Sequence, residues 1–148
     1  MVFGNCSIPA VIVLFILIVL SLLFTAAFSV DSAEELFNTA LKYQKNGQLD
    51  QAEQYYKASL KLKSDVDAMY NLGILYEDKN NYTEAEKYFK MAYDAGLSKA
   101  AYKLGYVYSK LNKKDLSERY YLQSVTKDNN IDAMYNLAVL YNRTSKKN

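Results

Sequence analysis

Between residues 68 and 92, apolar and small side chains fall into two sets with steps of three and four: Met69, Leu72, Gly73 and Tyr76, then Ala85, Tyr88, Phe89 and Ala92. Such steps place each set on one face of a helix. The polar segment DKNNY lies between the sets, and its Asp, Asn and Lys residues favour a turn. We therefore expect two helices joined by a short turn, with Thr83 as the cap of the second helix.

The same pattern recurs before and after this stretch, with a spacing of 32 or 33 residues. Tyrosines mark the register at two positions: Tyr43, Tyr76, Tyr108 and Tyr141 on first helices, and Tyr55, Tyr88 and Tyr120 on second helices. Hairpins are expected at about 33–64, 66–97 and 98–129, followed by a single helix at 131–143. Asn46-Gly47 is typical of a helix end, and Asp50 or Gln51 is expected to begin the partner helix.

The residues around Leu72-Gly73 resemble a tetratricopeptide repeat. In that family a bulky residue, Leu-Gly and Tyr on the first helix precede Ala, an aromatic residue and Ala on the second, and these places are held by Met69, Leu72-Gly73, Tyr76, Ala85, Phe89 and Ala92. No Pro closes the repeat, and the period is shorter than the usual 34 residues. The segment from Ala92 through Gly96 to Ala100 also resembles a Sel-like repeat, although the turn between the helices is short for that family.

The resemblance implies an all-α fold, an α-solenoid of antiparallel helical hairpins with three repeats and a C-terminal capping helix. Small residues recur where helices of such an array approach closely: Ala40, Gly73, Gly105 and Ala138 on first helices, and Ala52, Ala85 and Ser117 on second helices. Glycine inside a helix costs roughly 1 kcal/mol relative to alanine. Its recurrence at one position therefore indicates tight packing, and replacement of Gly73 by Leu should destabilise the array.

An apolar run without charged residues extends from Ile8 to Phe28 and predicts an N-terminal hydrophobic helix. It is long enough to span a membrane. Ala27-Phe28-Ser29 resembles a signal-peptidase site, whereas the lack of Lys or Arg before the run favours an uncleaved anchor. Residues 1–29 are thus a signal peptide or a transmembrane anchor, and the repeat domain at 30–148 is expected to be exported or membrane-tethered, outside the cytoplasm. The charges that flank the apolar run do not determine its orientation in a membrane.

The amino-acid composition argues against several classes of function. All charged residues, 18 basic and 16 acidic, follow the apolar run and are interspersed, which argues against a nucleic-acid partner. The chain has no histidine, one cysteine and no recognisable catalytic, zinc or phosphate-binding motif, so we expect neither an enzyme nor a bound cofactor or metal. Carboxylates such as Asp65, Asp67 and Asp132 stand at expected helix starts, where capping explains them.

Protein binding remains, because the family resemblance implies a concave groove along the first helices that accepts a peptide or a partner helix. An amide recurs at one position, in Asn38, Asn71 and Asn136, with Lys103 in the third repeat. Such side chains can hydrogen-bond to a peptide backbone without reading its sequence. The neighbouring positions hold apolar and aromatic residues: Phe37, Tyr70, Tyr102 and Tyr135, with Ile74, Tyr106 and Val139 about one turn further on.

Two other interpretations compete with this one. Asn and Tyr are frequent at these positions in the family, so the amides can be surface residues and the tyrosines core residues. Lys99, Lys103, Lys110 and Arg143 could bind a terminal carboxylate, but Tyr70 and Ile74 occupy places that the family's paired Lys and Asn pattern needs, which favours solvated lysines. We expect an adaptor that binds a protein or peptide. The alternative is a module that self-assembles through its apolar fourth helix, in which Ile131, Leu137 and Val139 are unusual for a lid.

Overall fold

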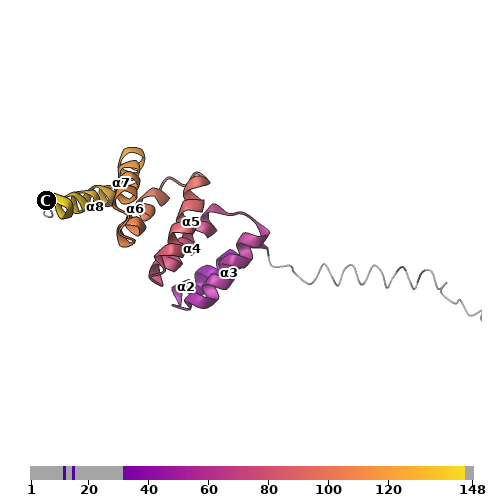
Figure 1. Ribbon diagram of the computed structural model, residues 1–148. Helices are drawn as coiled ribbons and strands as arrows, with labels where there is room; N and C mark the ends of the chain where they lie inside the picture. The colour runs from indigo at the N-terminus through magenta and orange to yellow at the C-terminus, as the bar shows by residue number, and fades with distance from the viewer. Residues whose placement is uncertain (1–11, 13–14, 16–31, 146–148) are drawn as a thin grey trace, which may run out of the picture. The chain divides into compact units, whose positions relative to one another are not determined.

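The computed structural model describes Ile12, Phe15 and residues 32–145, with side chains to Asn142 at the C-terminal end. The part from Ala33 onward contains seven helices and no β-strand: α2 (Ala33–Lys45), α3 (Leu49–Leu62), α4 (Val66–Asp78), α5 (Tyr82–Asp94), α6 (Ala100–Lys110), α7 (Lys114–Asp128) and α8 (Ile131–Ser145) (Figure 1). This confirms the all-α prediction. Apart from Ile12 and Phe15, the expected N-terminal hydrophobic helix lies outside the described residues. Among the described helices, none has both the length and the apolar character needed to cross a membrane.

The helices pack as antiparallel hairpins, α2 with α3, α4 with α5 and α6 with α7. Successive hairpins contact each other through α3 and α4 and through α5 and α6, while α8 packs on α7 and α6. One cluster of buried residues runs from Ala40 in α2 to Tyr120 in α7. The predicted solenoid of hairpins with a closing helix is therefore confirmed.

The turn inside each hairpin has the same geometry. The second of its three residues has a positive φ, 73° at Gly47, 56° at Asn80 and 59° at Asn112. The following residue donates its N–H to the carbonyl of the register tyrosine, over 2.9 Å from Gln48 to Tyr43, 2.8 Å from Asn81 to Tyr76 and 2.9 Å from Lys113 to Tyr108. This Schellman arrangement satisfies the carbonyls at the helix end. Gly and Asn occupy the position because they tolerate the left-handed conformation.

Some helix starts differ from the prediction. Asn81, and not Thr83, caps α5, since its Oδ1 accepts the N–H of Glu84 at 3.3 Å. The turn at Asn80 brings the chain into α5 at Tyr82, so Thr83 already lies within the helix. In the same way α3 begins at Leu49, before Asp50 and Gln51.

Of two predicted helix caps, Asp65 is confirmed and Asp132 is wrong. Asp65 caps α4 as predicted, because its carboxylate accepts the N–H of Ala68 at 3.0 Å. Asn130 caps α8 by accepting the N–H of Ala133 at 2.9 Å, so Asp132 lies in the first turn and is not the cap.

The register tyrosines stack in pairs within each hairpin. Ring centroids lie 5.2 Å apart for Tyr43 and Tyr55, 5.5 Å for Tyr76 and Tyr88, and 5.4 Å for Tyr108 and Tyr120, with interplanar angles of 13°, 11° and 25°. Stacked aromatic pairs add to the stability that their burial gives. The predicted equivalence of the tyrosine positions is therefore confirmed for the three hairpins.

The glycines on first helices each lie under an aromatic ring. A Cβ on Gly73 would be 2.6 Å from the ring of Phe89, and one on Gly105 would be 2.5 Å from the ring of Tyr121. Ser117, fully buried, donates its hydroxyl to the carbonyl of Gly105 at 2.8 Å. Tight packing at this position is therefore confirmed for α4 and α6. It is wrong for Ala138 on α8, which is exposed because no described helix covers that side.

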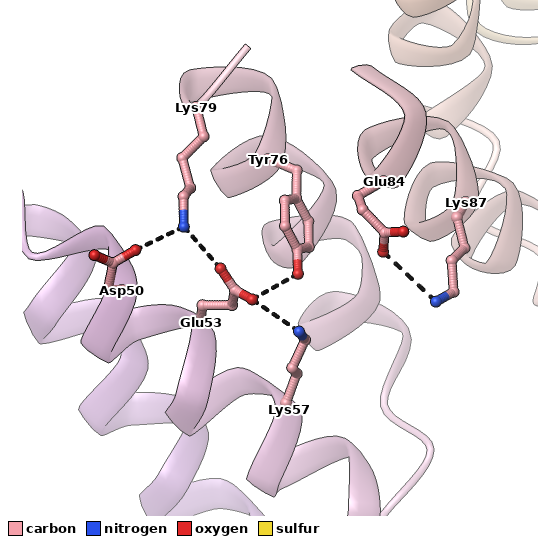
Figure 2. A network of polar contacts seen from close by, with 7 residues as sticks. All are labelled: Asp50, Glu53, Lys57, Tyr76, Lys79, Glu84 and Lys87. Carbon is pink, nitrogen blue, oxygen red and sulfur yellow. Dashed lines mark hydrogen bonds and ion pairs between the residues drawn. The ribbon is translucent and has the colours of Figure 1, made fainter. Parts of the chain in front are cut away.

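Polar contacts hold the first hairpin to the second (Figure 2). Glu53 on α3 accepts the hydroxyl of Tyr76 on α4 at 2.7 Å and the ammonium groups of Lys57 and Lys79, each at 2.8 Å. Lys79 also reaches Asp50 at 2.7 Å. Burial by itself would raise the pKa of Glu53, but the hydrogen bonds from Lys57, Lys79 and Tyr76 lower it to about 2. The carboxylate is thus held in its charged form.

Candidate partner-binding groove

The first helices α4, α6 and α8 are joined side by side through the positions that the sequence predicted for a groove. Lys103 of α6 binds both carboxylate oxygens of Glu77 on α4 at 3.0 Å. Asn136 of α8 donates its amide to the hydroxyl of Tyr102 on α6 at 3.4 Å. These contacts place three of the predicted residues, Lys103, Tyr102 and Asn136, on one surface with Glu77 of α4.

A hollow opens between α6 and α8 on this surface. It has a volume of about 280 Å³ and is lined by Tyr106, Ser109, Lys110, Tyr121, Asn136, Val139 and Leu140. Three of the predicted groove residues, Tyr106, Asn136 and Val139, come together here. The hollow offers hydroxyl, amide and ammonium groups beside aliphatic carbon, a mixture typical of sites that bind a peptide backbone and one side chain.

The aromatic residues predicted for the groove pack against the core with one side of each ring. Phe37 lies 5.7 Å from Tyr56, Tyr70 lies 5.5 Å from Phe89, and Tyr102 lies 6.2 Å from Tyr121, measured between ring centroids. These three residues are half-buried. Burial raises the pKa of Tyr70, with the charge of Lys103 opposing the rise. Each ring therefore packs on a second helix and leaves one edge toward solvent.

Tyr135 and Ile74 differ from that pattern. Tyr135 on α8 is 70% exposed, because no described helix lies where Phe89 and Tyr121 lie in the earlier repeats. Ile74 is half-buried and packs against the main core cluster. Of the two, Tyr135 is the one accessible to a partner.

The recurring amides do not form one uniform row. Asn38 is exposed on α2, Asn71 donates to the carbonyl of Asp67 in its own helix at 2.9 Å, and Asn136 lies in the hollow. At the equivalent place in α6, the charge of Lys103 is matched by Glu77. The hollow between α6 and α8 is therefore the part of the surface where an amide and an adjoining cavity coincide.

Lysines lie over two of the groove tyrosines. The Nζ of Lys99 is 4.5 Å from the centroid of the Tyr70 ring, and that of Lys110 is 5.1 Å from the centroid of Tyr106. Cation–π contacts of this length hold the ammonium group without neutralising it. The surface thus carries positive charge next to aromatic rings, which suits an acidic peptide more than a basic one.

Sequence reasoning did not select Ser109 and Leu140 for the site. A signal was present, because Ser109 follows Tyr106 by three residues and Leu140 follows Asn136 by four, the spacing of neighbours on a helix face. Among the described residues, no group of three His, Cys, Asp or Glu side chains could hold a metal ion.

Comparisons with known proteins agree with this architecture. One tetratricopeptide repeat family model matches residues 37–97 and another matches residues 98–130, which together make up well over half of the chain. No curated protein sequence matches the chain.

Solved structures share the fold. The first tetratricopeptide domain of Spaghetti (RPAP3), bound to the HSP90 peptide SRMEEVD, is 20% identical with a TM-score of 0.71, over 79% of this chain and 99% of that one. YrrB, described as having an unusual peptide-binding site, is 28% identical with a TM-score of 0.69, over 79% of this chain and 63% of that one.

The TPR2AB domain of yeast Sti1, solved in a pHSP90 complex, is 22% identical with a TM-score of 0.69, over 78% of this chain. The present chain spans 48% of that structure, so about half of it has no counterpart here.

Proposed function

Because the chain belongs to the tetratricopeptide repeat family, we propose that it is a protein-interaction adaptor that holds a peptide segment of a partner along α4, α6 and α8. The observation that carries the proposal is the hollow of about 280 Å³ between α6 and α8, where Tyr106, Asn136 and Val139 meet. Relatives of the same fold are described with bound peptides or a peptide-binding site. The chemistry of the surface supports binding rather than catalysis.

The partner segment is an extended peptide with an acidic group and an apolar side chain. Asn136 and Ser109 hydrogen-bond to its backbone, since an amide and a hydroxyl can each donate and accept. The apolar side chain lies against Val139 and Leu140. Lys110 attracts the acidic group, and its place over Tyr106 keeps the charge beside the hollow.

The adaptor acts outside the cytoplasm or at a membrane surface. The support is the uncharged apolar run from Ile8 to Phe28, which is long enough to cross a membrane and ends near a small-residue pair typical of signal cleavage. The mature protein's first residue, read by N-terminal sequencing, distinguishes the two forms. A start at Val30 indicates secretion, an intact Met1 indicates an anchor, and recovery of the intact chain in a soluble cytoplasmic fraction would contradict both.

Peptide binding is tested with the full-length protein in two steps. A phage-displayed library of random peptides, together with the acidic peptide SRMEEVD as a defined probe, is screened against the wild type, and affinities are measured by fluorescence anisotropy. We expect Val139→Glu and Lys110→Glu each to weaken binding of a selected peptide about tenfold or more, because both introduce a carboxylate at the hollow.

Lys61→Glu is the matched control. Lys61 is exposed on the second helix α3, so the same charge change there should leave the affinity within about twofold. Equal loss in all three variants, or a screen in which no peptide binds, would reject the proposed groove. Thermal unfolding followed by circular dichroism confirms that each variant is folded.

A further inference from the structure

An uncovered apolar face runs along α8. Four of its large side chains are exposed, Ile131 by 78%, Met134 by 44%, Tyr135 by 70% and Tyr141 by 45%. Steps of three and four place them around Ala138 on one side of the helix. The other side, with Ala133 and Leu137, is buried against Tyr121. Between residues 33 and 130, by contrast, large exposed apolar residues are isolated: Leu62, Met91 and Leu122.

This face repeats a surface that elsewhere in the molecule binds a helix. The α8 sequence AMYNLAVLY (133–141) differs from the α4 sequence AMYNLGILY (68–76) only at the sixth and seventh positions. In α4 the corresponding residues contact α5, since Tyr70 packs on Phe89 and Tyr76 stacks on Tyr88. The described part of the chain supplies no such helix for α8.

We propose that the uncovered face of α8 binds α8 of a second copy, antiparallel across a two-fold axis at Ala138. A two-fold interface is self-complementary, because a contact from residue i of one copy to residue j of the other is repeated from residue j to residue i. About this axis Ala138 faces Ala138 of the second copy, position 134 faces 142, and position 131 faces 145. The bulky Met134 is thus matched with the smaller Asn142.

The small residue at the centre favours an alanine-bearing helix as the occupant. In α4 and α6 a glycine makes room for an aromatic ring, and a Cβ there would lie 2.6 or 2.5 Å from that ring. Ala138 has this Cβ, so a helix that presents an aromatic ring at the same point cannot approach α8 as closely as α5 approaches α4. A second Ala138 can.

Charge and availability also favour a second copy. The residues of the face, Ile131, Met134, Tyr135, Ala138 and Tyr141, carry no charge, so symmetry brings no like charges together. In a second copy, α3, α5 and α7 are each packed in their own hairpin. Helix α8 is then the described helix that presents an exposed apolar side to a partner.

The size of the face is sufficient for pairing. A tyrosine can bury roughly 150–250 Å². At the observed exposures, the four large side chains present on the order of 500 Å² per copy. Two copies then bury about 1,000 Å² from these side chains alone. With the flanking polar residues, this approaches the roughly 1,200 Å² at the lower end of specific interfaces.

Cysteine cross-linking of the full-length protein tests the pairing. Cys6, the one cysteine of the chain, is replaced by Ser, and Ala138→Cys is introduced at the proposed axis. We expect a short bismaleimide to yield at least about tenfold more covalent dimer from Ala138→Cys than from Met91→Cys. Met91 is 39% exposed on the second helix α5 and provides the matched control.

A further variant links the dimer to the face itself. Tyr135→Glu in the Ala138→Cys background places two carboxylates in the apolar interface, and it should lower the dimer yield to the level of Met91→Cys. Equal cross-linking of Ala138→Cys and Met91→Cys, as association through the N-terminal segment would give, overturns the proposal. An undiminished dimer in the Tyr135→Glu variant also overturns it. Tyr135 does not line the hollow, so Tyr135→Glu tests the α8 face, whereas Val139→Glu and Lys110→Glu test the groove.

Discussion

Helices α4 and α8 carry nearly the same nine residues, and their surroundings differ. Met69 in α4 is 6% exposed and Met134 in α8 is 44% exposed, while Tyr76 and Tyr141 are 5% and 45% exposed. Helix α5 covers one side of α4, and no described helix covers that side of α8. The helical conformation is common to both, so it is set locally, whereas burial is set by the next helix in the array.

The difference has an energetic consequence. Burying a side chain of the size of Met or Leu stabilises a protein by about 1.5–3 kcal/mol relative to leaving it exposed. The residues of α4 therefore contribute to the stability of the single chain. Their counterparts in α8 contribute much less, and most of their apolar surface remains available for an intermolecular contact. Paired substitutions at equivalent positions of α4 and α8 measure this difference directly.

The largest effect is expected at the one face position where the two helices differ. Gly73→Leu places a bulky side chain where even a Cβ would lie 2.6 Å from the ring of the fully buried Phe89. We expect a loss of about 3 kcal/mol or more in the free energy of unfolding. The side chain of Ala138 is exposed, so Ala138→Leu should change the free energy of unfolding by about 0.5 kcal/mol or less. Urea unfolding followed by circular dichroism gives both values, and similar losses would contradict the tight packing of α4.

Truncation of the two methionines should give the next largest difference. Met69→Ala removes a buried side chain that packs with Ala92 and Ala100, and it should cost about 2–3 kcal/mol. Met134→Ala should cost about 1 kcal/mol or less, because its side chain is partly exposed. Unfolding is measured at low protein concentration, so that self-association does not add to the stability of α8. Equal costs would mean that α8 is covered in solution.

The features that sequence predicted well depend on local periodicity. The stacked tyrosine pairs and the glycines of α4 and α6 follow from steps of three and four within a helix and from the recurrence of the unit. The positive φ at Gly47 was also accessible, because Gly after a helix indicates a Schellman turn. At Asn80 the same conformation places the cap of α5 at Asn81, two residues before the predicted cap Thr83.

The features that sequence did not predict depend on how neighbouring helices meet. Nothing local indicates that Lys103 on α6 binds Glu77 on α4. The exposure of Ala138 was missed for the same reason, because its pattern is that of Gly73 and only the missing neighbour distinguishes them. The groove residues remain a prediction, with Tyr106, Asn136 and Val139 placed together at the hollow.

A pH-dependent difference of intermediate size is expected between the two ends of the array. The carboxylate of Glu53 accepts the hydroxyl of Tyr76 on α4, and that of Glu118 accepts the hydroxyl of Tyr141 on α8, each at 2.7 Å. The pKa of Glu53 in the fold is about 2, below its ordinary value of 4.5. Its stabilisation is therefore complete above about pH 4.5 and is lost as the pH falls toward 2.

Glu53→Gln should cost about 1–2 kcal/mol at pH 7, a range that allows for solvent screening of the two lysines. In urea unfolding, the difference in the free energy of unfolding between this variant and the wild type should become smaller as the pH is lowered from 5 to 2. Glu118→Gln should cost less, because its partner Tyr141 is 45% exposed whereas Tyr76 is 5% exposed. A gap for Glu53→Gln that does not change with pH would contradict the charged network at the first joint.

The smallest effect is expected when the same two tyrosines lose their hydroxyl groups. Tyr76→Phe leaves the half-buried Glu53 with its two lysine partners but without one donor, and it should cost about 1 kcal/mol. Tyr141→Phe removes a hydrogen bond at an exposed position, where water replaces the donor, and it should change stability less than Tyr76→Phe does. Both rings keep their packing, so the comparison isolates the hydroxyl. A larger loss for Tyr141→Phe than for Tyr76→Phe would show that the α7–α8 contact is protected from water, as it would be beneath a second copy.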